Sequence, residues 1–390
     1  MRVLISGAGI AGLGLGLCLS EKGHDVVICE RSPALRTSGY MLDFFGPGYE
    51  AAVRLGLLPA LKSIHRPVKW LTFVGRDGRT RLRLPYPVLR ERLFGGHHFN
   101  FMRGDLERVL YNAARSTVVF GREINAIESG RGRVRVRLSD GTVDDVDLLV
   151  GADGVNSRVR ALLFGPAARY VRRLGYDTAA FICEGRGEYA DLAGSLTTLT
   201  VPGRQVGACP TGDGHVAAFF THRGARPEAD YSVIAAREEL QRTYGDLGWV
   251  VPPLLEETSR VSDIDFDAVA QVVMPAWSAG RVVLVGDAAY AVSLVAGQGA
   301  SLALAGAFLL AQALEDSGPD VEAAVKAYET RLRPCVERQQ AAARSTAGWF
   351  VPESQIRIAV RDLALRFSAW PVASRLVRRQ LAGGDLPEPA

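Results

Sequence analysis

The first thirty residues place the strongest constraint on the fold. A short apolar strand runs into the pattern Gly7-x-Gly9-x-x-Gly12, an apolar helical stretch follows, and a second apolar strand ends at Glu30. This order of strand, glycine-rich turn, helix and strand predicts a βαβ unit, which typically opens a doubly wound α/β sheet.

Each glycine of the pattern has a physical reason. Gly7 permits the tight turn, Gly9 lets a pyrophosphate approach the backbone, and Gly12 lets the helix pack on the strand. The helix N-terminus offers free N–H groups to the phosphates. Glu30, with Arg31 beside it, stands where a carboxylate can accept a hydrogen bond from a ribose hydroxyl. We therefore predict a bound adenine dinucleotide, although this unit alone does not distinguish NAD from FAD.

Two later segments repeat the arrangement of a buried strand that enters a glycine-rich corner with an aspartate. They are the strand at 146–150 with Gly151-Ala-Asp153-Gly154, and the strand at 281–285 with Gly286-Asp287-Ala-Ala and then Gly297-Gln298-Gly299. Ligands of open α/β sheets bind at the carboxyl ends of the strands. Gly-Asp pairs are also common turn formers, so the prediction depends on all three motifs in this order.

Together the three motifs resemble the fingerprints of FAD-dependent class A aromatic monooxygenases, the family of para-hydroxybenzoate hydroxylase, aromatic polyketide hydroxylases and tetracycline-inactivating monooxygenases. The resemblance spans about residues 1–315. It implies an α/β fold with a Rossmann-like, GR2-type FAD-binding domain, an inserted, mostly β substrate domain and C-terminal helices. It also implies FAD as the bound cofactor and NAD(P)H as a transient co-substrate, since no second G-x-G-x-x-G stands at a strand-helix corner.

The resemblance also assigns roles to residues. Arg103, in an R-x-x-L-x-x-x-L pattern, would touch FAD, Asp287 would bond its ribityl or phosphate region, and Asp153 would act at the G-A-D-G corner. Segment 36–43 is similar to the tetracycline-inactivating branch, which links Arg36 to the nicotinamide cofactor and Asp43 to FAD. The expected cofactor-binding residues are Gly7, Gly9, Gly12, Glu30, Arg31, Arg36, Asp43, Arg103, Asp153, Gly286, Asp287, Gly297, Gln298 and Gly299.

The chain departs from the family where the third fingerprint continues. Tyr290 replaces the usual His, and Ala291 and Leu294 replace two prolines. Ser301 and Gly306 stand where the family often has Asn and Asp. The replaced positions line the flavin ring in the family, and proline fixes φ, so we expect a differently shaped or more flexible pocket. Tyr290, Leu294 and Phe219 are the candidates to line it. No protein acid or base is identified as catalytic, because the cofactor carries the chemistry.

The predicted FAD-binding domain is discontinuous. It comprises residues 1–68, 99–172 and 265–345, whereas 69–98 and 173–264 form a substrate-binding β-sheet domain and 346–390 a C-terminal helical segment. A strand at 134–138 presents Arg133, Arg135 and Arg137 on one face, which is typical of a solvated sheet edge. The C-terminal segment has three alternatives: packing on the flavin domain, a dimer contact, or a membrane-surface helix.

Composition argues against several other classes. With 46 Lys+Arg and 42 Asp+Glu, the net charge of +4 does not indicate nucleic-acid binding. Five cysteines without a CxxC predict neither disulfides nor a metal site, and favour a reducing cytoplasm. The uncharged stretch 296–314 contains glycines and polar residues, which favours a buried helix over an integral membrane segment. No H-E-x-x-H, G-x-S-x-G or Walker motif supports hydrolase or NTP-driven chemistry.

The sequence therefore predicts a cytoplasmic FAD-dependent, NAD(P)H-consuming monooxygenase, either a monomer or a homodimer. As the family implies, it would hydroxylate a small aromatic substrate, phenolic or a polycyclic natural product, using molecular oxygen and a flavin C4a-hydroperoxide. The departures at Tyr290, Ala291 and Leu294 leave a flavin oxidase, a dehydrogenase or an oxidative rearrangement enzyme as the first alternative. A non-catalytic flavin-fold binding protein is the second.

Overall fold

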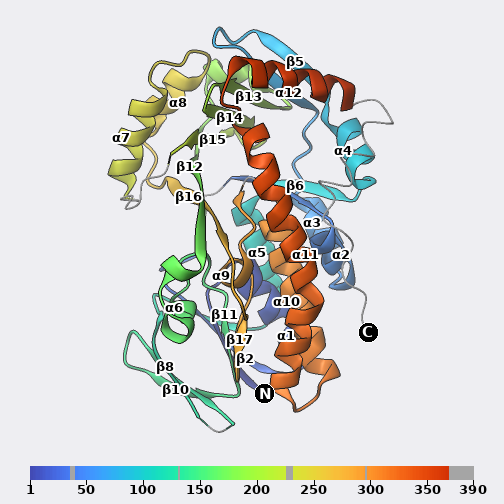
Figure 1. Cartoon of the computed structure of the whole chain (residues 1–390), viewed down its shortest axis with the longest axis vertical. Helices are drawn as coiled ribbons and strands as arrows, with labels where there is room; N and C mark the ends of the chain where they lie inside the picture. The colour runs from blue at the N-terminus through green and yellow to red at the C-terminus, as the bar shows by residue number, and fades with distance from the viewer. Residues whose placement is uncertain (36–39, 131, 225–231, 295–296, 369–390) are drawn as a thin grey trace.

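A six-stranded sheet carries the predicted βαβ unit near its centre. The computed structural model describes residues 1–35, 40–130, 132–224, 232–294 and 297–368 (Figure 1). The strand order is β17-β18-β11-β1-β2-β7, parallel throughout except for the β17–β18 pair. The strands are β1 Arg2–Ser6, β2 Asp25–Glu30, β7 Thr117–Phe120, β11 Leu148–Gly151, β17 Ser278–Ala279 and β18 Val282–Leu284. The three predicted corners therefore follow three adjacent strands, β18, β11 and β1, at one edge of the sheet.

In the described part of the chain, eight helices share a hydrophobic core with this sheet. They are α1 Ile10–Glu21, α2 Pro47–Arg54, α3 Leu58–Ser63, α5 Arg103–Ala113, α6 Arg158–Phe164, α9 Asp287–Tyr290, α10 Gly299–Asp316 and α11 Val321–Phe350. Helix α1 is buried from Ile10 through Leu19, and it packs so closely on α10 that a Cβ at Gly14 would lie 2.7 Å from Leu304 Cδ1. Most of α10 is buried as well, as predicted for this apolar stretch. Among the described residues, no helix is long and apolar enough to cross a membrane.

A small antiparallel sheet of order β10-β9-β8 corrects one prediction. Its strands are β8 Ile124–Ser129, β9 Val134–Leu138 and β10 Val143–Val146. Strand β9 is central, so its arginine face is not a sheet edge. The face is nevertheless solvated, because Arg133, Arg135 and Arg137 are exposed while Val134 and Val136 are buried. The predicted strand at 146–150 is divided, since β10 ends at Val146 and β11 begins at Leu148.

A seven-stranded sheet of order β16-β12-β15-β14-β13-β4-β5 forms the other half of the molecule (Figure 1). Its strands are β4 Trp70–Val74, β5 Thr80–Pro85, β12 Val171–Glu184, β13 Ser195–Val201, β14 Arg204–Pro210, β15 His215–Arg223 and β16 Asp265–Val272. Strand β16 thus belongs to this sheet, beyond the predicted boundary at residue 264. The division into domains stays a prediction.

The two faces of the seven-stranded sheet differ in their neighbours. On one face, Phe220 packs in a hydrophobic core with α7 Val233–Tyr244 and α8 Val251–Glu257. The adjacent Phe219 points to the opposite face, where its ring centroid lies 6.1 Å from that of Tyr40. Tyr40 directly precedes β3 Met41–Phe45, which pairs antiparallel with β6 His98–Met102. Helix α4 Tyr86–Phe94 leads from β5 toward β6. The short helices η1 Ala167–Arg169 and η2 Gly187–Leu192 complete the elements before α7.

The end of the described chain also differs from expectation. Helix α11 continues through residues 345 and 346, where a boundary was predicted, and α12 Gln355–Ser368 follows. Helix α12 packs on β13 and β5, not on the six-stranded sheet. Its buried Arg361 contacts Thr200 Oγ1 at 3.2 Å, and Asp362 pairs with Arg81. The dimer and membrane-surface alternatives stay predictions.

Candidate active site

The β1–α1 corner leaves its backbone open. Gly7 has φ +104°, and a Cβ there would lie 2.5 Å from Ala152 O; a Cβ at Gly12 would lie 1.9 Å from Gly7 O. Both positions therefore require glycine for the chain to fold. Gly9 differs, because it has φ −84° and its nearest neighbour for a Cβ is Glu107 Oε1 at 3.9 Å. Gly9 caps α1 without a side-chain hydrogen bond, so the N–H groups of the first turn remain available to a phosphate.

Glu30 is fixed at the end of β2 beside this corner. Its Oε2 accepts the N–H of Ala8 at 2.8 Å, and its Oε1 accepts the N–H of Ser32 at 2.8 Å. Each carboxylate oxygen keeps a second lone pair for another donor. Arg31, next to it, is exposed. The arrangement suits an acceptor for a ribose hydroxyl next to a pyrophosphate site.

Charged groups from distant segments gather around Arg103, the first residue of α5. Its Nε donates to Glu107 Oε1 at 3.1 Å. Desolvation works against the charged guanidinium, yet Glu107, Tyr40, Asp265 and Asp287 together raise the pKa of Arg103. Glu107 is four residues further along α5, a spacing at which helical side chains meet. Tyr40, Asp265 and Asp287 come from other elements and give no such local signal.

Asp287 lies at the point where three segments converge. A Cβ at Gly286, which has φ +67°, would lie 2.8 Å from Ala11 Cβ, and a Cβ at Gly299 would lie 3.8 Å from Asp287 Oδ1. Asp287 therefore sits close to the N-terminal ends of both α1 and α10. It is exposed, but the surrounding protein desolvates its carboxylate and raises its pKa, while the Arg103 charge opposes the rise. An exposed yet desolvated carboxylate is expected of a group in a recess.

The start of α10 resembles the start of α1. Gln298 is the N-cap residue of α10, and its side chain makes no capping hydrogen bond to that helix. Gly297 before it has φ +66°. Gln298 is buried, whereas Gly297 is exposed. Two helix N-termini that lack side-chain caps thus lie on either side of Asp287.

At the β11–α6 corner, the predicted cofactor residue Asp153 bonds to the protein's own backbone. Asp153 Oδ2 accepts the N–H groups of Arg158 at 2.7 Å and Val159 at 3.1 Å, and Ser157 Oγ accepts that of Arg160 at 3.0 Å. Asp153 therefore caps helix α6, a role that sequence reasoning missed. Its Oδ1 is buried without a hydrogen-bond partner in the described protein, and a contact of Asp153 with the cofactor stays a prediction.

Tyr290 does not line an open pocket, contrary to prediction. Its side chain is 2% exposed and packs against Trp277, with ring centroids 4.7 Å apart. The tyrosine ring points into the core, where its hydroxyl accepts a hydrogen bond from Tyr328 OH at 3.1 Å. Leu294 is half-buried in the loop after α9, and Phe219 faces Tyr40, so both remain candidates. Arg36 lies outside the described residues.

Asp43 forms a polar network that sequence reasoning did not foresee. Its carboxylate accepts hydrogen bonds from Tyr86, Arg90 and Asn100, three donors of the protein itself. Burial lowers the pKa of Arg90 to about 9, and Arg90 stacks on Tyr86 with its guanidinium carbon 4.7 Å from the ring centroid. The contact of Asp43 with FAD stays a prediction.

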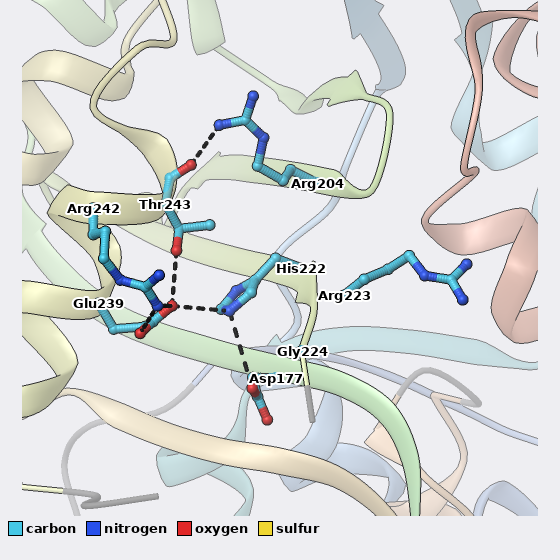
Figure 2. A pocket seen from close by; sticks show the side chains of 8 residues that line it. All are labelled: Asp177, Arg204, His222, Arg223, Gly224, Glu239, Arg242 and Thr243. Atoms are coloured by element: carbon cyan, nitrogen blue, oxygen red, sulfur yellow. Dashed lines mark hydrogen bonds and ion pairs between the residues drawn. The ribbon is translucent and has the colours of Figure 1, made fainter. Parts of the chain in front are cut away.

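A polar cavity of about 200 Å³ lies on the α7 side of the seven-stranded sheet (Figure 2). Its lining residues are Asp177, Arg204, His222, Arg223, Gly224, Glu239, Arg242 and Thr243. His222 Nε2 lies 3.4 Å from Glu239 Oε1 and 4.0 Å from Asp177 Oδ2. Glu239 also accepts from Arg242 and Thr243, so the lining groups largely satisfy one another. The predicted pocket residue Phe219 is on the opposite face, and this cavity is separate from the corners above.

All five cysteines are free and buried, and burial raises the pKa of Cys18, Cys29 and Cys209 to about 12. Among the described residues, no cluster of His, Cys, Asp and Glu could hold a metal ion.

Comparisons with known proteins identify the class. Residues 91–343 match the FAD binding domain family. An uncharacterized protein of Mycobacterium tuberculosis is 33% identical over 342 residues, which cover 87% of this chain and 91% of that protein. The FAD-dependent monooxygenase asL6 of Sarocladium schorii is 32% identical over 377 residues, 87% of this chain and 86% of that protein. The crystal structure of tetracycline destructase Tet(51) shares the fold, with a TM-score of 0.85 over 100% of this chain and 99% of that chain at 24% identity.

The fold is that of the class A flavin monooxygenases. The chain belongs to the FAD binding domain family, and it is an FAD-dependent monooxygenase. This confirms the predicted family, fold class, enzyme class and FAD cofactor.

Proposed function

We propose that this monooxygenase hydroxylates a small aromatic substrate, phenolic or a polycyclic natural product, and that it consumes NAD(P)H and molecular oxygen. One observation carries the placement of its site: the uncapped α1 N-terminus, the fixed Glu30 carboxylate and the Arg103–Asp287 charges all lie near one edge of the six-stranded sheet. A dinucleotide bound along this edge would find N–H donors for its pyrophosphate, an acceptor for its ribose hydroxyls and charged groups near its ribityl chain.

FAD would be held by the residues around the open corners. The first turn of α1 would bind the pyrophosphate at Gly9, since neither a side chain nor a cap occupies that position. Glu30 would accept a ribose hydroxyl, and Asp287 would accept hydrogen bonds from the ribityl or phosphate region. Arg103, held by Glu107, would supply the positive charge beside them.

Bound FAD, reduced by the nicotinamide, supplies the activation of oxygen and its transfer to the substrate. The protein contributes electrostatics and shape. The N-terminal end of α10 at Gly297–Gly299 stabilises negative charge that develops close to it. Tyr40 and Phe219, which meet between the two halves of the molecule, supply an apolar surface for an aromatic ring and help to exclude water.

The test is a labelled turnover experiment on the purified chain. We expect a yellow protein with FAD near a one-to-one ratio, whose NADH or NADPH oxidation is stimulated by phenolic compounds. With ¹⁸O₂, one labelled oxygen atom should enter the product. A chain that cannot be reconstituted with FAD, or a product without label, would contradict the proposal.

One observation favours an oxidase as a second candidate. Ser293 is a buried, non-glycine residue with φ +104°, in the loop where the family has prolines. A positive φ is unusual for a non-glycine residue, and this one stands directly before Leu294, one of the two positions where the family has proline. Hydrogen peroxide formed in proportion to NAD(P)H, without oxygenated product, would favour this alternative.

A further inference from the structure

The hydroxyl of Tyr290 occupies a crowded position behind the site. Tyr290 is the last residue of α9, and its N–H donates to Gly286 O at 3.0 Å. Its ring packs against Trp277, which itself lies under Arg333 at 4.8 Å. Only two residues, Ala288 and Ala289, lie between Tyr290 and the exposed Asp287. The buried Tyr290 ring therefore anchors the short helix α9, which begins at Asp287.

Two hydroxyls and one carbonyl form a chain at this point. Tyr328 OH lies 3.1 Å from Tyr290 OH and 3.4 Å from Leu284 O. Tyr328 OH is the donor in both contacts, so its single hydrogen favours the shorter one, to Tyr290 OH. Burial raises the pKa of both phenols, so both keep their protons. The chain ties α9 and the end of β18 to the long helix α11.

Gly306 makes room for this arrangement. A Cβ at residue 306 would lie 1.9 Å from Tyr290 OH, 3.1 Å from Leu332 Cδ2 and 3.2 Å from Tyr290 Cζ. The departures from the family pattern at 290 and 306 are therefore coupled, since a tyrosine at 290 requires glycine at 306. The coupling joins α10, whose N-terminus borders Asp287, to the same hydroxyl.

We propose that Tyr290 is a positioning residue, which sets the Asp287 turn for FAD through the hydroxyl chain to Tyr328 and Leu284. The inference rests on the proposed role of Asp287 in FAD binding. It assigns Tyr290 no contact with substrate or flavin.

The test is a double-mutant cycle on FAD affinity, measured by titration of the apoprotein with quenching of flavin fluorescence. Tyr290→Phe keeps the ring and removes only the hydroxyl, and we expect the Kd for FAD to rise about fivefold, the weight of one neutral hydrogen bond. In an Asp287→Asn background, the same change should raise the Kd by less than about twofold, because the group that it positions is already lost.

The outcomes separate the two hypotheses. If Asp287→Asn alone leaves the Kd unchanged, the proposed role of Asp287 fails. If Asp287→Asn weakens binding but Tyr290→Phe does not, or if the two effects simply add, the role of Tyr290 is overturned. Tyr244→Phe is the matched control, because Tyr244 is also fully buried and its hydroxyl pairs with His222 Nδ1 at 3.2 Å in the other half of the molecule. It should lower stability and leave the Kd unchanged.

A second variant pair tests the coupling directly. Gly306→Ala alone should weaken both folding and FAD binding, because its Cβ meets the hydroxyl. Gly306→Ala combined with Tyr290→Phe should recover stability, since the closest contact is then about 3.1 Å. A double variant no more stable than Gly306→Ala alone would contradict the assigned contact.

Discussion

Two neighbouring corners of the six-stranded sheet have similar sequences and different structures. The β1–α1 corner has no side-chain cap on its helix, whereas Asp153 and Ser157 close the β11–α6 corner by capping α6. The two corners are in close backbone contact, since a Cβ at Gly7 would clash with Ala152 O. A helix end that its own side chains satisfy offers less to an anion than one left open. A glycine-rich corner therefore indicates a binding site only when its N–H groups remain unused.

The largest effect on the affinity for FAD is expected at the β1–α1 corner, whose helix has no side-chain cap. Gly9→Ala should raise the Kd for FAD by about 100-fold or more, because a methyl group would push the pyrophosphate from several charge-assisted hydrogen bonds. The fold should tolerate the change, since nothing lies within 3.9 Å of the added Cβ. Fluorescence titration gives the Kd, and thermal unfolding of the apoprotein gives the stability. Gly187→Ala, in an exposed position without contacts, is the control.

Asp287→Asn should raise the Kd for FAD by about tenfold, the loss of a charged hydrogen-bond acceptor. The same change should stabilise the apoprotein at neutral pH, because the raised pKa of Asp287 means that folding disfavours its ionised form.

The pH dependence of this stability gain has a defined sign. The gain should disappear as the pH falls through the raised pKa toward the ordinary value near 4, where both side chains are neutral. Denaturant unfolding of both apoproteins between pH 4 and about 7.5 measures it. A gain that grows on acidification would contradict the assignment.

Glu30→Gln should have a smaller effect, with the Kd for FAD raised about fivefold. The amide keeps one acceptor, but its NH₂ group then faces the N–H of Ala8 or Ser32. Titration with FAD and with FMN separates the causes: FMN lacks the adenosine ribose, so its weaker binding should not change. If the affinities for FAD and for FMN fell equally, Glu30 would not contact the adenosine ribose.

The smallest effect on the affinity for FAD is expected at the β11–α6 corner, where side chains cap the helix. Asp153→Ala should cost about 1 kcal/mol of stability as a lost helix cap, while the Kd for FAD changes less than about threefold. Ser157→Ala removes the second capping side chain of α6, and it should have the same effects on stability and on the Kd for FAD as Asp153→Ala. Urea unfolding of the apoproteins and FAD titration measure both quantities. A tenfold loss of FAD affinity in Asp153→Ala alone would break the comparison.

Sequence predicted best what local pattern determines. The glycines of the first corner and the parallel strands behind them follow from short-range spacing, and so does the apolar helix α10. Glu107 could have been found from its four-residue spacing to Arg103. Tyr40 and Asp265 could not, because only tertiary packing brings them to Arg103. The buried position of Tyr290 depends on Gly306 and on Tyr328, which is 38 residues away.

The proposed FAD site extends from the open α1 N-terminus along this edge of the sheet. A crystal structure of the FAD complex tests it most directly. We expect pyrophosphate density within hydrogen-bond distance of the first-turn N–H groups of α1, with the adenosine ribose at Glu30. A well-ordered FAD whose pyrophosphate lies away from α1 would contradict it.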